Sequence, residues 1–248
     1  MHRFFVTPES VSGNMVLIDK EQSHHILKVL RLKPGDYLEL FDGQGNVFSC
    51  RLSRQENGGV LAEIQNKVYH ANEPAVRVVL AQGIARGEKM DYLIQKAVEI
   101  GVSAIVPFVS ERTVVVLDQN KSQRKNDRWK KIAREACKQS RRNIIPEISP
   151  VILWPQLLSS LQDKRAVIFY EEEENIRLRQ ILAGWKDDLK TRSITIIVGS
   201  EGGFTPDEIQ MAKDRNISVA GLGSRILRTE TAGLAAASII LYEGGDLG

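Results

Sequence analysis

The side chains best suited to chemistry lie in two glycine-bearing segments near the C-terminus. Residues 199–206 read GSEGGFTP, and residues 221–232 read GLGSRILRTETA. Within them, the carboxylates of Glu201 and Glu230 could accept a proton, and the fixed positive charge of Arg228 could stabilise an anion. Each has a structural alternative, because a glutamate can cap a turn or favour a helix start and Arg228 could pair with either glutamate. These three residues are the catalytic candidates.

Each segment follows a predicted strand and leads into a predicted helix. The apolar run 194–198 has the length and β-branched content of a buried strand. Thr205 followed by Pro206 is typical of a helix start, and this helix is expected to run to about Arg215. Residues 217–220 form the next predicted strand, and a second helix begins at Thr229. Because ligands bind beyond the carboxyl ends of the strands in an open α/β sheet, the two segments are expected to line one pocket.

The spacing of the glycines argues against a phosphate cradle. A dinucleotide fingerprint needs glycines at its first, third and sixth positions, and the run Gly221, Gly223, Ile226 fails at the sixth. The Gly-Lys-Ser/Thr of a P-loop is absent from both segments. These glycines are instead expected to let the backbone approach a ligand directly. A ligand without phosphates, such as an adenosyl group joined to an amino acid, fits that description.

Residues 199–204 and 222–232 together closely resemble the paired motifs of the bacterial 16S ribosomal RNA uridine-N3 methyltransferases (small subunit methyltransferase E) of the SPOUT superfamily. Upstream matches extend the resemblance over nearly the whole chain. They are RGEKM at residues 86–90, QKAVEIGV at residues 95–102, and Glu135, Ala136, Gln139, Ser140 and Arg142.

The resemblance implies an α/β fold in two domains. Residues 1–72 would form a PUA-like, RNA-binding β-barrel, and residues 73–248 a SPOUT methyltransferase domain with a parallel sheet. SPOUT proteins tie a deep trefoil knot, here expected at about residues 192–241, that holds S-adenosylmethionine, and they usually act as homodimers. Sequence physics alone predicts an unknotted doubly wound domain, because knots are close to absent from protein folds.

The resemblance also implies roles for individual residues. The expected cofactor-binding residues are Gly199, Gly203, Leu222, Gly223, Ile226, Leu227 and Ala232, with Tyr170 at the carboxyl end of a predicted strand added to them. The expected RNA-binding residues are Lys28, Arg31, Lys33, Arg86, Lys89, Arg141 and Arg142. The expected RNA partner is 16S rRNA, free or in the 30S subunit.

The rest of the chain reads as short strands followed by alternating strands and helices. In the first part, strands are predicted at 15–18, 36–41, 47–52 and 60–64, with a helix at about 20–29, and together they indicate a small β-barrel. Residues 71–76 read as a linker. Beyond it, strands are predicted at 76–82, 104–109 and 166–170, and helices at 89–100, 127–140, 154–161 and 175–183.

Composition narrows the class of protein. The chain is 42% hydrophobic and 26% charged, has no apolar run long enough to span a membrane, and starts without the pattern of a signal peptide, so a cytoplasmic protein is expected. The two cysteines and four histidines show no ligand spacing, and no metal is expected. Residues 121–142 contain ten Lys or Arg against two acidic residues. This stretch is either a contact surface for a phosphate backbone or a solvated helix face.

Methyl transfer to uracil N3 sets a specific chemical task. The sulfonium of S-adenosylmethionine needs in-line placement of the nucleophile and exclusion of water. Uracil N3 must lose its proton, so a base or an anion-stabilising cation is required. Two other functions stay open: a related enzyme that methylates a tRNA ribose, and a non-catalytic RNA-binding protein of the ribosome.

Overall fold

The computed structural model describes residues 1–248 except 57, 70–71, 115–118, 162–164, 187–188 and 190–192. The described chain forms two compact units. The first consists of Met1–Glu73 together with Cys137–Ile145, and the second of Pro74–Ala136 together with Pro146–Gly248. Part of the predicted linker, at 71, and the first residue of the expected knot, 192, lie outside the described residues.

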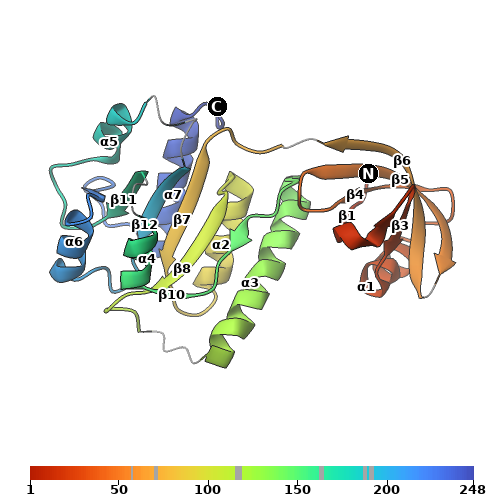
Figure 1. Ribbon diagram of the computed structural model, residues 1–248, viewed down its shortest axis with the longest axis horizontal. Coiled ribbons are helices and arrows are strands. Elements are labelled where there is room, and N and C mark those ends of the chain that lie inside the picture. The colour runs from red at the N-terminus through yellow and green to blue at the C-terminus, as the bar shows by residue number, and fades with distance from the viewer. Residues whose placement is uncertain (57, 70–71, 115–118, 162–164, 187–188, 190–192) are drawn as a thin grey trace. The chain divides into compact units, whose positions relative to one another are not determined.

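The first unit is built on a six-stranded sheet (Figure 1). Its strands are β1 (Arg3–Phe5), β2 (Val11–Ser12), β3 (Met15–Ile18), β4 (Tyr37–Phe41), β5 (Asn46–Glu56) and β6 (Gly59–Tyr69), in the order β1-β4-β5-β6-β3-β2. Only the β1–β4 pair is parallel among these neighbours. A 3-10 turn, η1 (Pro8–Ser10), lies between β1 and β2, and α1 (Lys20–His24) continues into a π-helical turn, η2 (His25–Val29).

The helix α1 begins where its capping residue requires. The Asp19 side chain accepts a hydrogen bond from the Gln22 amide at 2.9 Å and so satisfies a free helix N–H. Ile26 in η2 packs into the apolar core of this unit, which also contains Phe4, Leu38 and Phe48. The predicted helix at 20–29 therefore exists, but its second half is wound more widely than an α-helix.

The second unit contains an all-parallel sheet, as predicted. Its strands are β7 (Arg77–Gly83), β8 (Ala104–Val109), β9 (Glu147–Ile148), β10 (Ile152–Leu153), β11 (Arg165–Phe169), β12 (Ser193–Val198) and β13 (Ser218–Ala220). The order is β10-β8-β7-β12-β11-β13, with β9 also paired to β8. Every pairing between the described strands of this sheet is parallel, so the carboxyl ends of these strands lie at one edge of the sheet.

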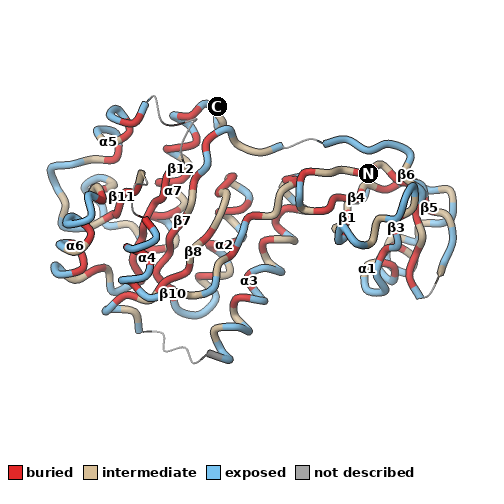
Figure 2. The backbone as a smooth tube through the Cα atoms, in the orientation of Figure 1, coloured by how far each residue is buried: buried red, intermediate tan, exposed pale blue. Residues whose placement is uncertain are grey.

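Helices cover both faces of this sheet (Figure 1). They are α2 (Lys89–Ile100), α3 (Gln119–Ser140), α4 (Trp154–Ser160), α5 (Leu178–Gly184), α6 (Pro206–Lys213) and α7 (Thr229–Glu243). Helices α4 and α6 share one apolar cluster with Ala81 and Ile197. Leu80, which points to the opposite face, lies against Gly233 of α7. Figure 2 shows that buried residues follow the central strands β7, β8 and β12.

Helix α3 belongs to both units. It starts at Gln119, earlier than the predicted residue 127, and its residues from Cys137 onward are assigned to the first unit. The C-terminus is tied to the second unit, because the Asp246 carboxylate accepts hydrogen bonds from the amides of Ala75 (2.9 Å) and Val76 (3.1 Å). This contact fixes the end of α7 beside the start of β7.

Candidate cofactor pocket and active site

The two glycine-bearing segments border one cavity of about 420 Å³ at the carboxyl edge of the parallel sheet. This volume lies within the range of pockets that bind small molecules. The shared pocket predicted from the sequence is therefore present. Its lining residues are Lys89, Phe169, Tyr170, Glu171, Val198, Gly199, Ser200, Glu201, Gly203, Phe204, Gly221, Leu222, Gly223, Ser224, Arg225, Ile226, Leu227, Arg228, Thr229, Glu230 and Ala232.

The first loop, residues 199–204, is held by the core below it and by the helix after it. Phe204 is fully buried, with its ring centroid 5.2 Å from that of Trp154. Thr205 caps α6 as predicted, since its hydroxyl accepts from the Glu208 amide while the buried Glu208 carboxylate accepts from the Thr205 amide at 3.0 Å. The same carboxylate accepts from the Glu111 amide at 2.9 Å. The loop is thus fixed at its end by packing and capping together.

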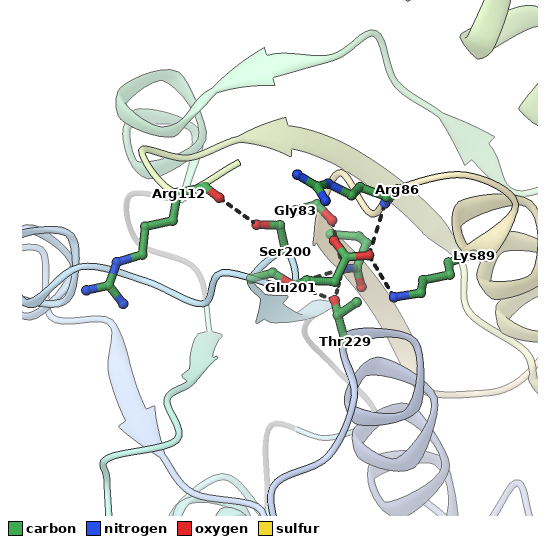
Figure 3. Close-up of polar contacts among 9 residues, drawn as sticks. Gly83, Arg86, Lys89, Arg112, Ser200, Glu201 and Thr229 are labelled. Atoms are coloured by element: carbon green, nitrogen blue, oxygen red, sulfur yellow. Dashed lines mark hydrogen bonds and ion pairs between the residues drawn. The ribbon is translucent and has the colours of Figure 1, made fainter. Parts of the chain in front are cut away.

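Glu201 lies in this loop but faces another segment. Its carboxylate accepts from the Lys89 ammonium at 2.9 Å and from the Arg86 amide at 3.1 Å (Figure 3). Burial opposes ionisation of Glu201, but these two bonds and a bond from its own backbone amide outweigh it, so the pKa of Glu201 is lowered. A carboxylate with a lowered pKa is a weaker proton acceptor. Glu201 thus joins the loop after β7 to the loop of residues 199–204, and this contact is called the Glu201 clip below.

Arg228 and Glu230 flank the start of α7 and both line the cavity. Arg228 is the N-cap residue and is exposed, and the described residues offer it no ion pair with Glu201 or Glu230. The Oε2 atom of Glu230 is buried and has no hydrogen-bond partner among the described residues. A free guanidinium and an unsatisfied carboxylate oxygen therefore face the same pocket. Unpaired buried acceptors are uncommon in folded proteins and are expected at functional sites.

Tyr170 and Glu171 form another wall of the cavity, at the end of β11. Burial, a hydrogen bond to Glu172 and the negative charges of Glu172 and Glu171 raise the pKa of Tyr170 to about 12. The phenol therefore keeps its proton at neutral pH and can donate a hydrogen bond. Gly203, at φ +64°, adopts a backbone conformation that disfavours other residues, and a Cβ there would lie 2.5 Å from the Glu171 carboxylate.

The structure places every predicted cofactor-binding and catalytic residue on this cavity. Ile226, predicted to contact the cofactor, is 87% exposed, so it stands at the lip and is open to a ligand. No individual role was predicted for the remaining lining residues, although most of them belong to the two segments that were expected to line one pocket. These are Phe169, Glu171, Val198, Ser200, Phe204, Gly221, Ser224, Arg225 and Thr229, to which Lys89, predicted for RNA, is added. Six of them lie within the two glycine-bearing segments, which was the available signal, whereas Phe169, Glu171 and Val198 lie at or just after the ends of β11 and β12.

The predicted RNA-binding residues fall into different environments. Lys28, Arg31 and Lys33 are exposed in the first unit, and Arg141 is exposed as well. Arg142 is not available, which corrects the expectation for it: its side chain is 5% exposed and its guanidinium binds the Glu73 carboxylate, with Nε 3.0 Å from Oε2.

In the second unit, Arg86 is exposed and Lys89 is bonded to Glu201. The expected RNA contact of Lys89 would therefore compete with that ion pair. Arg86 keeps its side chain exposed while only its backbone amide is used by Glu201.

The residues that the structure describes contain no cluster of three or more His, Cys, Asp or Glu side chains able to hold a metal ion. None of their helices is both long and apolar enough to cross a membrane. Cys50 and Cys137 are buried, and burial raises the pKa of each thiol to about 12. Neither cysteine is a candidate nucleophile, because the thiolate is the reactive form.

Comparison with known proteins agrees with this geometry. Residues 72–241 match the model of an RNA methyltransferase domain, and residues 18–65 match that of an RNA methyltransferase PUA domain. The ribosomal RNA small subunit methyltransferase E of Bacillus subtilis is 36% identical over 98% of this chain and 97% of its own length. The protein of the same name from Buchnera aphidicola is 31% identical over 98% of this chain and 94% of its length.

A solved structure of a similar protein contains a bound ligand. The ribosomal RNA small subunit methyltransferase E of Neisseria gonorrhoeae, crystallised with bound S-adenosyl methionine, is 35% identical to this chain, covers 98% of it with 97% of its own length, and superposes with a TM-score of 0.85. Sequence identity and fold agree over nearly the full length of both chains. The chain belongs to the ribosomal RNA small subunit methyltransferase E family.

Proposed function

We propose that this chain transfers the methyl group of S-adenosylmethionine to N3 of a uridine in 16S rRNA of the small ribosomal subunit. The observation that carries the proposal is the single cavity shared by residues 199–204 and 221–232, in a chain whose relatives are named for methylation of this rRNA. A solved relative holds S-adenosyl methionine. Bound there, the cofactor supplies an electrophilic methyl group on a positively charged sulfonium.

The pocket suits such a ligand on its own evidence. Its glycines bring backbone N–H and C=O groups to the cavity, and neither loop carries the lysine of a phosphate cradle. Leu222, Leu227 and the exposed Ile226 supply apolar wall for an adenine ring. The residues that would hold the cofactor are those predicted from the sequence: Tyr170, Gly199, Gly203, Leu222, Gly223, Ile226, Leu227 and Ala232.

The catalytic roles divide between Arg228 and Glu230. Glu230 has an unsatisfied buried oxygen in the pocket and is the proposed acceptor of the uracil N3 proton. Arg228 has a free guanidinium at the rim and is proposed to stabilise the negative charge that develops on the base. Glu201, held by Lys89 and the Arg86 amide, is proposed to position the loop rather than to take the proton.

The strand order supports the knot implied by the family resemblance. Strand β13 lies at the edge of the sheet, yet α7, which follows it, packs on the central strands β7 and β12 and on α2. The chain between residues 221 and 229 must therefore return across the carboxyl edge, past the loop that follows β12. We include a trefoil knot in this segment in the proposal, with the cofactor held by its loops.

RNA binding is proposed for two regions. One is the first unit, whose sheet corresponds to a PUA-type domain, here taken to be a PUA-like barrel, with exposed Lys28, Arg31 and Lys33. The other is the polar face of α3, where Lys121, Arg124 and Lys130 are exposed. Arg86 and Arg141 extend the proposed basic surface. Phosphate contacts of this kind weaken as salt rises.

A homodimer is also proposed, with α7 in its interface. This helix is apolar around its whole circumference instead of on one face, and its outer side exposes Ile239 (42%) and Tyr242 (65%). A helix of that composition is typically buried on all sides. A second copy of the chain would cover the exposed side and lie close to Arg228 and Glu230 at the helix start.

Mass spectrometry of 16S rRNA from a strain lacking the gene tests the function directly. The proposal requires loss of one methyluridine, with the methyl group on N3, and its return when the gene is restored. Loss of a tRNA ribose methyl group would favour the tRNA-modifying alternative. Failure of the purified chain to bind S-adenosylmethionine would favour a non-catalytic RNA-binding protein. A cytoplasmic location is part of the proposal, because the proposed substrate is ribosomal RNA.

A further inference from the structure

Gln82 lies directly behind the pocket without lining it. It is the next-to-last residue of β7, is fully buried, and points toward α7. Its Nε2 atom donates to the Gly83 carbonyl at 2.9 Å and to the Thr229 hydroxyl at 2.8 Å, and it lies 3.3 Å from the Gly199 carbonyl oxygen. The lining residues of the cavity include Gly199 and Thr229 but not Gln82.

The contacts form a relay between segments that are far apart in the sequence. The Thr229 hydroxyl accepts a hydrogen bond from Gln82 and donates one to the Gly199 carbonyl at 2.5 Å. Figure 3 shows Thr229 and Gly83 on either side of this network, beside the Glu201 clip. Hydrogen bonds in such chains strengthen one another. One side-chain amide thus holds together the end of β7, the loop of residues 199–204 and the first turn of α7.

The orientation of the Gln82 amide is fixed by its neighbours. Two carbonyl oxygens and a hydroxyl that donates elsewhere surround the Nε2 position, so only the NH₂ group fits there. The Oε1 atom therefore faces away, toward Gly233, and is buried without a hydrogen-bond partner among the described residues. An apolar side chain of similar length would leave no unsatisfied acceptor. The arrangement points to a role for the donor itself.

We propose that Gln82 is a positioning residue for the cofactor pocket. Its amide sets the distance between Gly199 in the first loop and Thr229 at the start of α7, and so places Glu230, the residue after Thr229. A binding site is held open in its productive geometry by such supporting side chains. This inference rests on the proposed function, because it assumes that the cavity receives S-adenosylmethionine.

Calorimetric titration of the full-length chain with S-adenosylmethionine tests it. Gln82→Met removes the donor and keeps the length of the side chain, and we expect the Kd to rise by about 10-fold, the effect of losing one buried hydrogen-bond network contact. Thr195→Val is the matched control, because Thr195 is a polar residue that is also buried in this sheet, on β12. The Thr195→Val variant should bind S-adenosylmethionine with the Kd of the wild type. A purely structural role would lower the melting temperature of Gln82→Met without changing the Kd.

A second pair of variants covers the case in which Gln82→Met fails to fold. Thr229→Val removes the same relay from its other end, whereas Thr229→Ser keeps the hydroxyl and should bind more tightly than Thr229→Val. The double variant Gln82→Met with Thr229→Val should bind no more weakly than the worse single variant, because both changes break one network.

The outcomes separate the inference from the function. If the wild type does not bind S-adenosylmethionine, the proposed function is wrong and the inference falls with it. If the wild type binds and Gln82→Met or Thr229→Val binds within twofold of it, only the positioning role is wrong.

Discussion

Replacing Glu201 by glutamine distinguishes a clip from a catalytic base. The change keeps the size of the side chain and removes the charge that Lys89 contacts at 2.9 Å. The two side chains are 39% and 31% exposed, so solvent screens the pair, and such pairs contribute about 0.2–1 kcal/mol. The loss of the ion pair should therefore change loop position, and with it methyl transfer, by no more than about fivefold.

A general base would give a much larger effect. Removing one costs about 10²- to 10⁴-fold in rate, and we expect this loss for Glu230→Gln. The assay is single-turnover transfer of a labelled methyl group from S-adenosylmethionine to small ribosomal subunits, with the Kd of the cofactor measured in parallel. A rate loss above 100-fold in Glu201→Gln at unchanged Kd would refute the clip and return Glu201 to the role of base.

Four further predictions follow from the geometry. Gly83→Ala would place a Cβ 2.4 Å from the Ser200 amide nitrogen, so it should both weaken cofactor binding and lower the melting temperature. Gly184→Ala is the control, because a Cβ there has no neighbouring atom within 4 Å, and it should be neutral in both assays. Arg142→Ala leaves the partly buried Glu73 carboxylate, whose side chain is 13% exposed, without its cation and should cost about 3 kcal/mol in urea unfolding. Arg141→Ala, at an exposed residue, should only weaken RNA binding in a filter assay. Because the pKa of Glu201 is lowered from 4.5, its pair with Lys89 should stabilise the fold at neutral pH. This stabilisation should be lost as pH falls through the lowered pKa, so the small difference in melting temperature between wild type and Glu201→Gln should shrink steadily as pH is lowered below 4.5. Ile239→Asp with Tyr242→Asp should convert a dimer into a monomer in light scattering, and an unchanged mass would remove α7 from the interface.

Local patterns were enough to predict most of the second unit. The strand at 104–109 and the helix at 89–100 have the predicted bounds, because a β-branched apolar run and an amphipathic helix ended by Gly101 are each encoded by neighbouring residues. The parallel sheet followed from the alternation of strands and helices. The shared pocket followed in turn, since parallel strands end at one edge.

Short strands and long-range contacts were beyond such patterns. The strands β1, β9 and β10 have two or three residues, too few to show a period. Arg142 reads as part of a basic stretch, but its burial depends on Glu73, which is 69 residues away in the sequence. Gln82 reads as a polar residue at a strand end, and only the fold brings it to Thr229, which is 147 residues away. The residues around Glu201, a glutamate in a glycine-rich turn, do not indicate that its carboxylate binds Lys89, which is 112 residues away in the sequence.

Cofactor binding by the cavity at the carboxyl edge of the sheet is the claim on which the rest depends, and titration calorimetry with a pocket-filling variant tests it most directly. Ala232 is 9% exposed and lines the cavity in α7, whereas Ala183 in α5 is exposed and is not one of the lining residues. The structure predicts that the wild type and Ala183→Leu bind one S-adenosylmethionine per chain and that Ala232→Leu binds it at least about 10-fold more weakly, a difference of 1.4 kcal/mol. Equal binding by Ala232→Leu and the wild type would show that the cofactor is held elsewhere.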